Sequence, residues 1–201
     1  MMKMIMSLIL FLSLCVLCNA GSAQGWVVPS RPDNENSSCE KLYYTGYGMK
    51  VRLIENLATR NGPSTQYTGC GYYQMNGETV RVITRAFDNG GVQWVLVEFA
   101  YGGAVRRAYT GAKRLNLTAN QLAMLPEEDM TEYIGYGTVD TNVNPKWGPG
   151  DQYTTYTERT IKRGSRVAVI SYENGYYMVE SYHTDGNVLR SWIPVFDVIL
   201  D

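Results

Sequence analysis

The sequence has one histidine, His183, in 201 residues. Catalysis by a Ser–His–Asp or Cys–His arrangement would have to use it, and it lies at the end of an expected strand beside a turn. Zinc sites need three or four Cys or His ligands at close spacing, and the sequence has no such group. It has no glycine-rich phosphate loop, and no spacing singles out a pair of acids. We therefore predict a protein that is not an enzyme and that uses no metal and no cofactor.

Blocks of like charge are also missing. Without its first 23 residues the chain has 17 basic and 19 acidic side chains, a net charge near −2. Nucleic acids and anionic membrane surfaces are bound through basic faces. Neither is an expected partner.

Long hydrophobic runs are absent after residue 18. Before that point, Lys3 is followed by an apolar stretch from Met4 to Cys18 and then by small residues up to Ala23. This pattern predicts a secretory signal peptide over 1–23. The cysteines lack the small preceding residue of a lipid-attachment site. We expect a secreted or cell-wall-associated protein with no membrane span.

Cysteine is scarce in the exported chain, where only Cys39 and Cys70 remain. An oxidising compartment favours a disulfide between them, and two free thiols are the alternative. Residues 24–42 are rich in Ser, Pro, Asp and Asn. That composition predicts an extended N-terminal arm.

One six-residue pattern is present twice. Gly62–Tyr67 reads GPSTQY and Gly148–Tyr153 reads GPGDQY, 86 residues later. Several flanking segments recur in the same order, which indicates a duplicated module with its length differences in loops. The recurring pairs are YTGYG and YIGYG, VRVI and VAVI, WVLVE and YYMVE, and RAY and RSW, with offsets between 82 and 89.

Alternating apolar residues between strong turn formers predict short strands in both copies. The first copy covers 43–117 and the second 133–201, with a short helical turn after the last strand of the first copy and a closing turn and final strand in the second. The expected strands are 49–58, 79–87, 92–99 and 105–110 in the first copy, and 166–172, 176–182 and 188–193 in the second.

Residues 118–132 are expected to join the copies through a short helix. Thr118 is its N-cap, Gln121 completes a capping box and Pro126 ends it. Glu127–Asp129 is expected to be solvated linker. The fold class predicted is all-β, with two tandem small β-barrels joined by a short helical linker.

The run from Leu57 to Ser64, the later Trp94 and the segment Arg107–Gly111 resemble the bacterial branch of the Src homology 3 (SH3) domain family. Members have an Arg-x-Gly-Pro-Ser signature in the first long loop. The second copy departs from it, because Lys146–Gly150 has no Arg and no Ser at the matching places. The resemblance implies SH3-like barrels on exported proteins that bind peptidoglycan or accompany a cell-wall hydrolase.

Sixteen Tyr and four Trp against four Phe favour aromatic rings that tolerate a wet surface. Alternation places some of these rings in the core instead. Arg60, Gly62, Pro63, Gly148 and Pro149 are expected to shape the two repeated loops. The candidate ligand-binding residues are Tyr67, Tyr72, Trp94, Tyr101, Tyr109, Trp147, Tyr153, Tyr156, Tyr176 and Trp192.

The expected function is that of a secreted binding protein that recognises peptidoglycan peptides or other cell-wall components. Its partner would be a cell-wall peptide or glycopeptide, held in aromatic grooves, with two modules adding avidity if both engage. The alternative is an interaction module that regulates a separate cell-wall hydrolase or a host factor.

Overall fold

A computed structural model describes residues 48–130, 132–183 and 186–201. The expected signal peptide, the arm 24–42, Cys39 and the first residues of the first copy lie outside the described residues. So does part of the turn between residues 183 and 187. The described chain is all-β with one short α-helix and two sheets, which confirms the predicted class.

The N-terminal sheet has seven strands in the order β1-β4-β5-β6-β2-β3, with β7 paired in parallel to β4. The other pairings are antiparallel. A 3₁₀ turn, η1 (Ala112–Arg114), follows the sixth strand, as the sequence predicts. The strands are β1 (Met49–Arg52), β2 (Leu57–Arg60), β3 (Gly69–Tyr73), β4 (Thr79–Phe87), β5 (Gln93–Tyr101), β6 (Ala104–Gly111) and β7 (Glu127–Glu128).

The C-terminal sheet has five antiparallel strands in the order β11-β10-β9-β8-β12. A second 3₁₀ turn, η2 (Val195–Asp197), precedes the last strand. By sequence, β9, β10 and β11 correspond to β4, β5 and β6. The strands are β8 (Gly135–Val139), β9 (Arg166–Glu173), β10 (Tyr176–Tyr182), β11 (Val188–Pro194) and β12 (Val198–Leu200).

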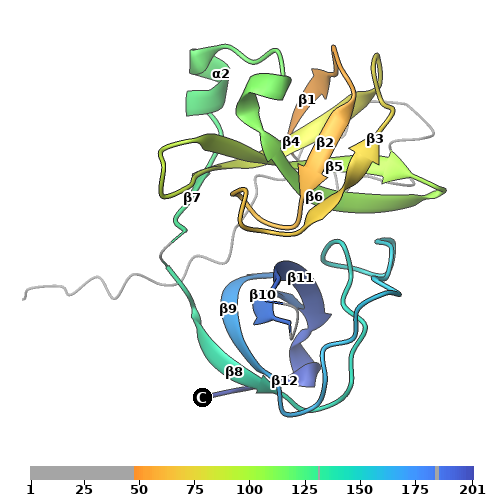
Figure 1. Ribbon diagram of the computed structural model, residues 1–201, viewed down its shortest axis with the longest axis vertical. Helices are drawn as coiled ribbons and strands as arrows, with labels where there is room; N and C mark the ends of the chain where they lie inside the picture. Colours follow the sequence, from red (N-terminus) through yellow and green to blue (C-terminus); the bar gives the residue numbers. More distant parts are fainter. Residues whose placement is uncertain (1–47, 131, 184–185) are drawn as a thin grey trace, which may run out of the picture.

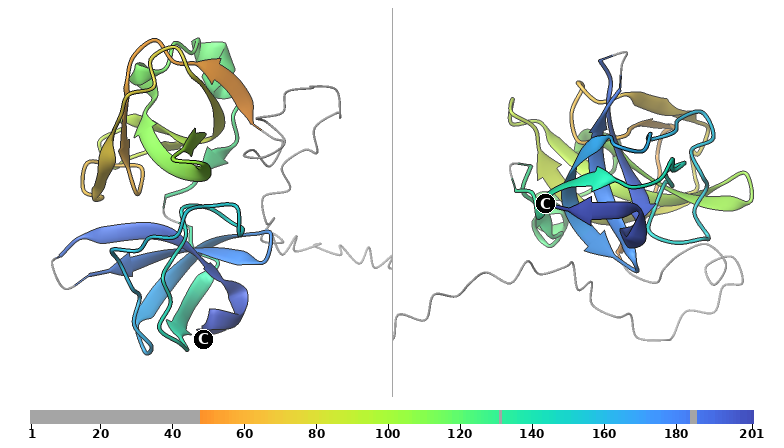
Figure 2. Two further views of the ribbon diagram at one scale, coloured as in Figure 1. Left: turned by 90° about the vertical axis from the view of Figure 1, so that its right-hand side faces the viewer. Right: turned by 90° about the horizontal axis from the view of Figure 1, so that it is seen from below.

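The two sheets form two bodies, one above the other (Figure 1). The segment after β7 runs down one side from the first body to β8. The loop between β2 and β3 points down toward the second body, while loops between β8 and β9 rise toward the first (Figures 1 and 2). In the described residues neither strand order returns to its first strand, so the expected closed barrels are not observed.

Local chemistry explains the hairpins. Asp88 Oδ1 accepts hydrogen bonds from the backbone N–H groups of Gly90 and Val92, both at 2.9 Å, and thereby closes the β4–β5 turn. In the β9–β10 turn, Asn174 and Gly175 have φ values of 49° and 81°. Two positive φ values in succession match the right-handed twist of a hairpin. Both turns lie where the sequence predicts them.

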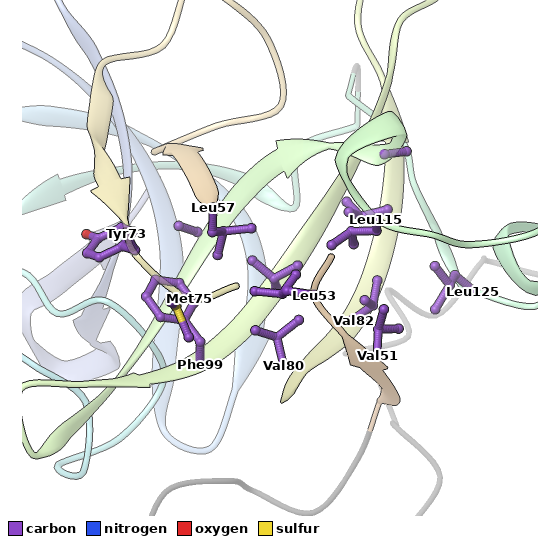
Figure 3. Packing of buried hydrophobic residues seen from close by; sticks show 14 of the residues in the cluster. Val51, Leu53, Leu57, Tyr73, Met75, Val80, Val82, Phe99, Leu115 and Leu125 are labelled. Carbon is purple, nitrogen blue, oxygen red and sulfur yellow. The ribbon is translucent and has the colours of Figure 1, made fainter. Parts of the chain in front are cut away.

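A single apolar core underlies the N-terminal sheet. Leu53 and Val80 lie in the middle of its row of side chains, with Tyr73 and Phe99 at one end and Leu125 at the other (Figure 3). Each of these residues is at most 7% exposed. Full burial of an aliphatic or aromatic side chain contributes about 1.5–3 kcal/mol, so this row is a main source of stability.

The connector differs from the expected helical linker. Its helix, α2, covers only Ala119–Ala123, although Thr118 and Gln121 form the predicted capping box. The expectation of a solvated segment at Glu127–Asp129 is confirmed for Glu127 and Asp129, which are exposed, but is wrong for Glu128, which lies in β7 and is 5% exposed. No helix of the described ranges has the length and apolar character that crossing a membrane would require.

Candidate functional site

The faces that the two sheets turn toward each other are built from residues that correspond between the copies. Ile83 corresponds to Ile170, Leu96 to Met178, and Tyr109 to Trp192. All six belong to one buried cluster, together with Trp94. The interface is therefore pseudo-symmetric, as expected when two copies of one module pack through the same face.

Arg107 of β6 lies at the centre of the first polar network in this interface. Its Nε donates to Glu98 Oε2 at 2.7 Å, within the same sheet. Its Nη1 and Nη2 donate to the two carboxyl oxygens of Glu173 in the other sheet, at 2.7 and 3.0 Å. Tyr153, also from the second copy, donates its hydroxyl to Glu98 and places its ring 5.3 Å from the guanidinium carbon.

The second network repeats the first with the copies exchanged. Arg190 of β11 donates from Nε to Glu180 Oε2 at 3.1 Å and from Nη1 to Glu128. Tyr67 of the first copy donates to Glu180 at 2.6 Å, and its ring lies 5.3 Å from the Arg190 guanidinium carbon. Each copy thus inserts one tyrosine into the arginine–glutamate pair of the other.

The fourth member of each network is the glutamate from the opposite sheet, and the two glutamates do not occupy corresponding positions in the two copies. Glu173 lies at the end of β9, and the matching residue of the first copy is Ala86 in β4. Ala86 cannot supply a carboxylate, but its parallel neighbour in β7 is Glu128. Tyr109 also donates its hydroxyl to Glu128, at 2.7 Å. The strand pairing of β7 therefore brings the missing acid to Arg190.

The repeated Gly-Pro loops serve to hold these tyrosines. A Cβ atom on Gly62 would lie 2.3 Å from the ring of Tyr67, and one on Gly148 would lie 2.1 Å from the ring of Tyr153. Real Cβ atoms do not approach other atoms so closely, so only glycine fits under either ring. Arg60 Nη1 fixes the first loop by donating to the carbonyl of Tyr67 at 2.7 Å.

Burial sets the protonation of the network. It raises the pKa of Tyr67 and raises that of Tyr109 well above its usual value, so both phenols keep the protons they donate. Burial also raises the pKa of Glu173 to about 8. The single positive charge of Arg107 is shared between Glu173 and Glu98, which is fully buried. The arginine therefore does not neutralise both acids.

Most of the sequence-predicted ligand residues lie in this interface or in a core. A ring at most 8% exposed offers little surface to a ligand, so the main role of these residues is packing. Trp147, expected in an exposed loop, packs on the core of the other copy and stacks on Tyr156 with centroids 4.2 Å apart. The six buried residues are Tyr67, Trp94, Tyr109, Trp147, Tyr153 and Trp192.

Four of the ten remain accessible. Tyr72 is 63% exposed and Tyr101 47%, whereas Tyr156 and Tyr176 are half-buried. Tyr176 is partly engaged, because its hydroxyl donates to Asp151 at 3.0 Å. The structure thus splits the predicted set into interface residues and a smaller exposed group.

Tyr101 belongs to an aromatic cage that sequence reasoning did not identify. We define the cage as Tyr73, Tyr101 and Trp147, which surround the guanidinium of Arg106. The guanidinium carbon lies 4.7 Å from the ring centre of Tyr101, 4.9 Å from that of Trp147 and 5.9 Å from that of Tyr73. Such contacts are attractive, because the face of an aromatic ring is negative.

Cys70 is a free thiol, so the structure does not support the expected disulfide. Its predicted partner Cys39 lies outside the described residues. Cys70 Sγ donates to Asn61, which also accepts a hydrogen bond from Tyr156 at 3.0 Å. Burial raises the pKa of the thiol to about 12. The thiol therefore stays protonated at neutral pH.

The cavities found between the sheets are small. Two of them have volumes of about 20 Å³ each, lined in part by Arg107, Met178 and Trp192. A space of that size holds a single water molecule. In the described ranges, no group of three or more Cys, His, Asp or Glu side chains is arranged to hold a metal ion.

Comparisons with protein-family models, with curated proteins and with solved structures find no match to this chain. The functional proposal therefore depends on the chemistry of the residues themselves.

Replacing Gly62 by Ala should destabilise the protein by about 1–3 kcal/mol, because the new methyl group would overlap the ring of Tyr67. Urea unfolding measures the change. Gly111→Ala is the matched control, since a Cβ there meets nothing within 4 Å. In a Tyr67→Ala background, Gly62→Ala should cost almost nothing more. An equal cost in both backgrounds would contradict the steric explanation.

Replacing Arg190 by Met should lower the free energy of unfolding by about 3–5 kcal/mol, because Glu128 and Glu180 would stay buried without a cation. The control is Arg166→Met. Its ion pair with Asp201 is largely solvent-exposed, and its loss should cost below about 1 kcal/mol. Similar costs for the two variants in urea unfolding would show that the network contributes little.

The pKa of Glu173 predicts a pH dependence of stability. The folded state raises this pKa from 4.5 to about 8, so it holds the proton more tightly than the unfolded chain. The stabilisation from this group is complete below pH 4.5 and declines as the pH rises to about 8. The measurement is the urea unfolding midpoint of the wild type and of Glu173→Gln between pH 4 and 9. The difference between the two midpoints should fall as the pH rises. A flat difference curve would refute it.

Proposed function

We propose that the chain is an exported, non-catalytic binding protein for peptide or glycopeptide segments of a bacterial cell wall. The observation that supports this is the aromatic cage around Arg106, whose outer ring, Tyr101, is 47% exposed. Tyr, Trp and Arg are the residue types that dominate recognition surfaces, because they combine a large apolar area with a polar group. The resemblance to bacterial SH3 domains favours the same function.

The proposed protein binds as one unit with one site. Both signature loops are engaged at the interface, where Tyr67 and Tyr153 bind the opposite copy. A second groove equivalent to the first is therefore not required, and the avidity of two independent modules is replaced by a site that both copies build. Trp147 comes from the second copy, and Tyr73, Tyr101 and Arg106 come from the first.

Two features support the non-catalytic part of the proposal. The thiol of Cys70 is held protonated by burial, which removes the nucleophilic thiolate. The acidic and tyrosine partners of Arg107 and Arg190 fill the polar networks, and two cavities beside them have volumes of about 20 Å³ each. The networks therefore have the properties of structural ion pairs.

A separate observation favours the alternative, a folded protein partner. Phe196 of η2 is 81% exposed, and Ile199 and Leu200 of β12 are 60% and 44% exposed. Exposed apolar side chains gathered in one short segment often mark a protein–protein contact. In this alternative the chain regulates a cell-wall hydrolase or a host factor through the end of the C-terminal sheet.

A pull-down of the exported chain on purified peptidoglycan sacculi tests the proposal. Wild type should bind, and Tyr101→Ala should lose most of the bound fraction, because the outer wall of the cage is removed. Tyr172→Ala is the matched control. Tyr172 is 45% exposed and also contacts a second tyrosine, but it lies in the C-terminal sheet. It should bind like the wild type.

Three outcomes separate the hypotheses. Equal binding by the two tyrosine variants would reject the cage as the site. Absence of wild-type binding would reject the cell wall as the ligand and leave the protein partner. In that case Phe196→Ser should abolish capture of the partner, whereas Tyr101→Ala should not. Unfolding midpoints close to that of the wild type must accompany each result.

A further inference from the structure

We propose that Arg106 is a carboxylate-binding residue, and that the ligand of the cage is a peptide with a free carboxylate beside an apolar group. The inference rests on the proposed function, because it names the ligand chemistry of the same surface. It begins from the difference between two consecutive arginines in β6.

Arg106 and Arg107 point to opposite sides of their strand and have opposite kinds of neighbours. Arg107 binds two carboxylates, those of Glu98 and Glu173. Arg106 contacts three aromatic rings, and no described carboxylate pairs with it. The half-buried guanidinium of Arg106 has no carboxylate beside it among the described residues. It therefore retains the capacity to bind an anion.

The donors of Arg106 show where that anion would lie. Nη1 donates to the hydroxyl of Tyr73 at 3.0 Å. Nε is buried, and no described residue accepts a hydrogen bond from it. Nη2 has no described hydrogen-bond partner either, but it is not buried, so it is the nitrogen that a ligand carboxylate would reach. A hydrogen bond between a guanidinium and a carboxylate is charge-assisted and therefore strong.

The position of Arg106 is fixed from both copies. Tyr73 holds one nitrogen, while the rings of Tyr101 and Trp147 contact the guanidinium. The backbone of Trp147 is also hydrogen-bonded to β6, the strand of Arg106. Its carbonyl accepts a hydrogen bond from the backbone N–H of Arg107 at 2.9 Å. A preorganised guanidinium loses little conformational entropy when it binds.

The residues of the cage site differ between the two copies. The residue of the second copy that corresponds to Arg106 is Leu189, which is 2% exposed, and the counterpart of Trp147 in the first copy is Asn61. The interface networks recur in both copies, but the caged arginine occurs once. It is therefore not part of the repeated networks, and a ligand contact would account for it.

The probe for the test is acetyl-Ala-Ala with a free C-terminal carboxylate, compared with the same dipeptide as its C-terminal amide. Both are titrated at millimolar concentration into the exported chain, and the indole resonances of the tryptophans are followed by NMR. The acid should shift the Trp147 resonance and bind at least about tenfold more tightly than the amide, because a charge-assisted pair contributes about 1.5–3 kcal/mol.

Variants assign the effect to Arg106. Arg106→Gln should remove the preference for the acid. Arg106→Lys keeps the charge but lacks the planar guanidinium, and should retain only part of it. Arg166→Gln is the control, because Arg166 also lies over a tyrosine ring, at 5.3 Å from Tyr136, but pairs with Asp201. It should leave the preference unchanged.

The result that overturns the proposal is equal binding of acid and amide, no binding of the acid, or an unchanged preference in Arg106→Gln. The sacculus experiment separates this failure from that of the proposed function. If Tyr101→Ala loses sacculus binding and Arg106→Gln does not, the function stands and the carboxylate contact is rejected. If the acid binds through Arg106 and the sacculi do not bind, the contact stands and the cell-wall ligand is rejected.

Discussion

Two buried arginine–glutamate pairs, each completed by a tyrosine from the other copy, determine how this chain is organised. Burying a charge is costly, and the cost is offset only where partners satisfy every donor. Arg107 and Arg190 each donate to two acidic side chains, one from each half, and each lies near the ring of a tyrosine from the opposite half. The halves are therefore energetically dependent on each other. A chain that resembles two binding modules in tandem behaves as one structural unit.

The dependence of each half on the other explains the role of the two repeated Gly-Pro loops. The sequence predicts that the Gly-Pro residues shape the two loops and that Tyr67 and Tyr153, which follow them, contact a ligand. In the pair, Gly62 and Gly148 provide the space for a tyrosine that crosses to the opposite half. The binding surface that we propose lies where the copies differ, at Arg106 and the rings around it. The residues that recur in both copies form the interface between them.

Local signals in the sequence were sufficient for the long strands and their turns. The expected strand 49–58 is instead two short strands, β1 and β2, and the short strands β3, β7 and β8 were not predicted. Alternation and turn formers placed β4 and β10 at their observed bounds, and the capping box of Thr118 was recognised. Contacts between distant residues were not predictable in this way. Arg81 and Arg85 alternate with Ile83 on one face of β4, yet Arg81 is 3% exposed and Ile83 lies in the buried interface. Alternation identifies a face but does not reveal what covers it.

The pairing of Tyr67 with Glu180 and of Tyr153 with Glu98 has a consequence for a solitary module. A module with such a loop, arginine and glutamate is complementary to a second copy of itself, because each supplies what the other lacks. The tandem chain therefore has the internal geometry of a homodimer whose subunits have been fused head to tail. Fusion would free one half from the need to resemble the other, and the two halves do differ at Arg106, where the second has Leu189.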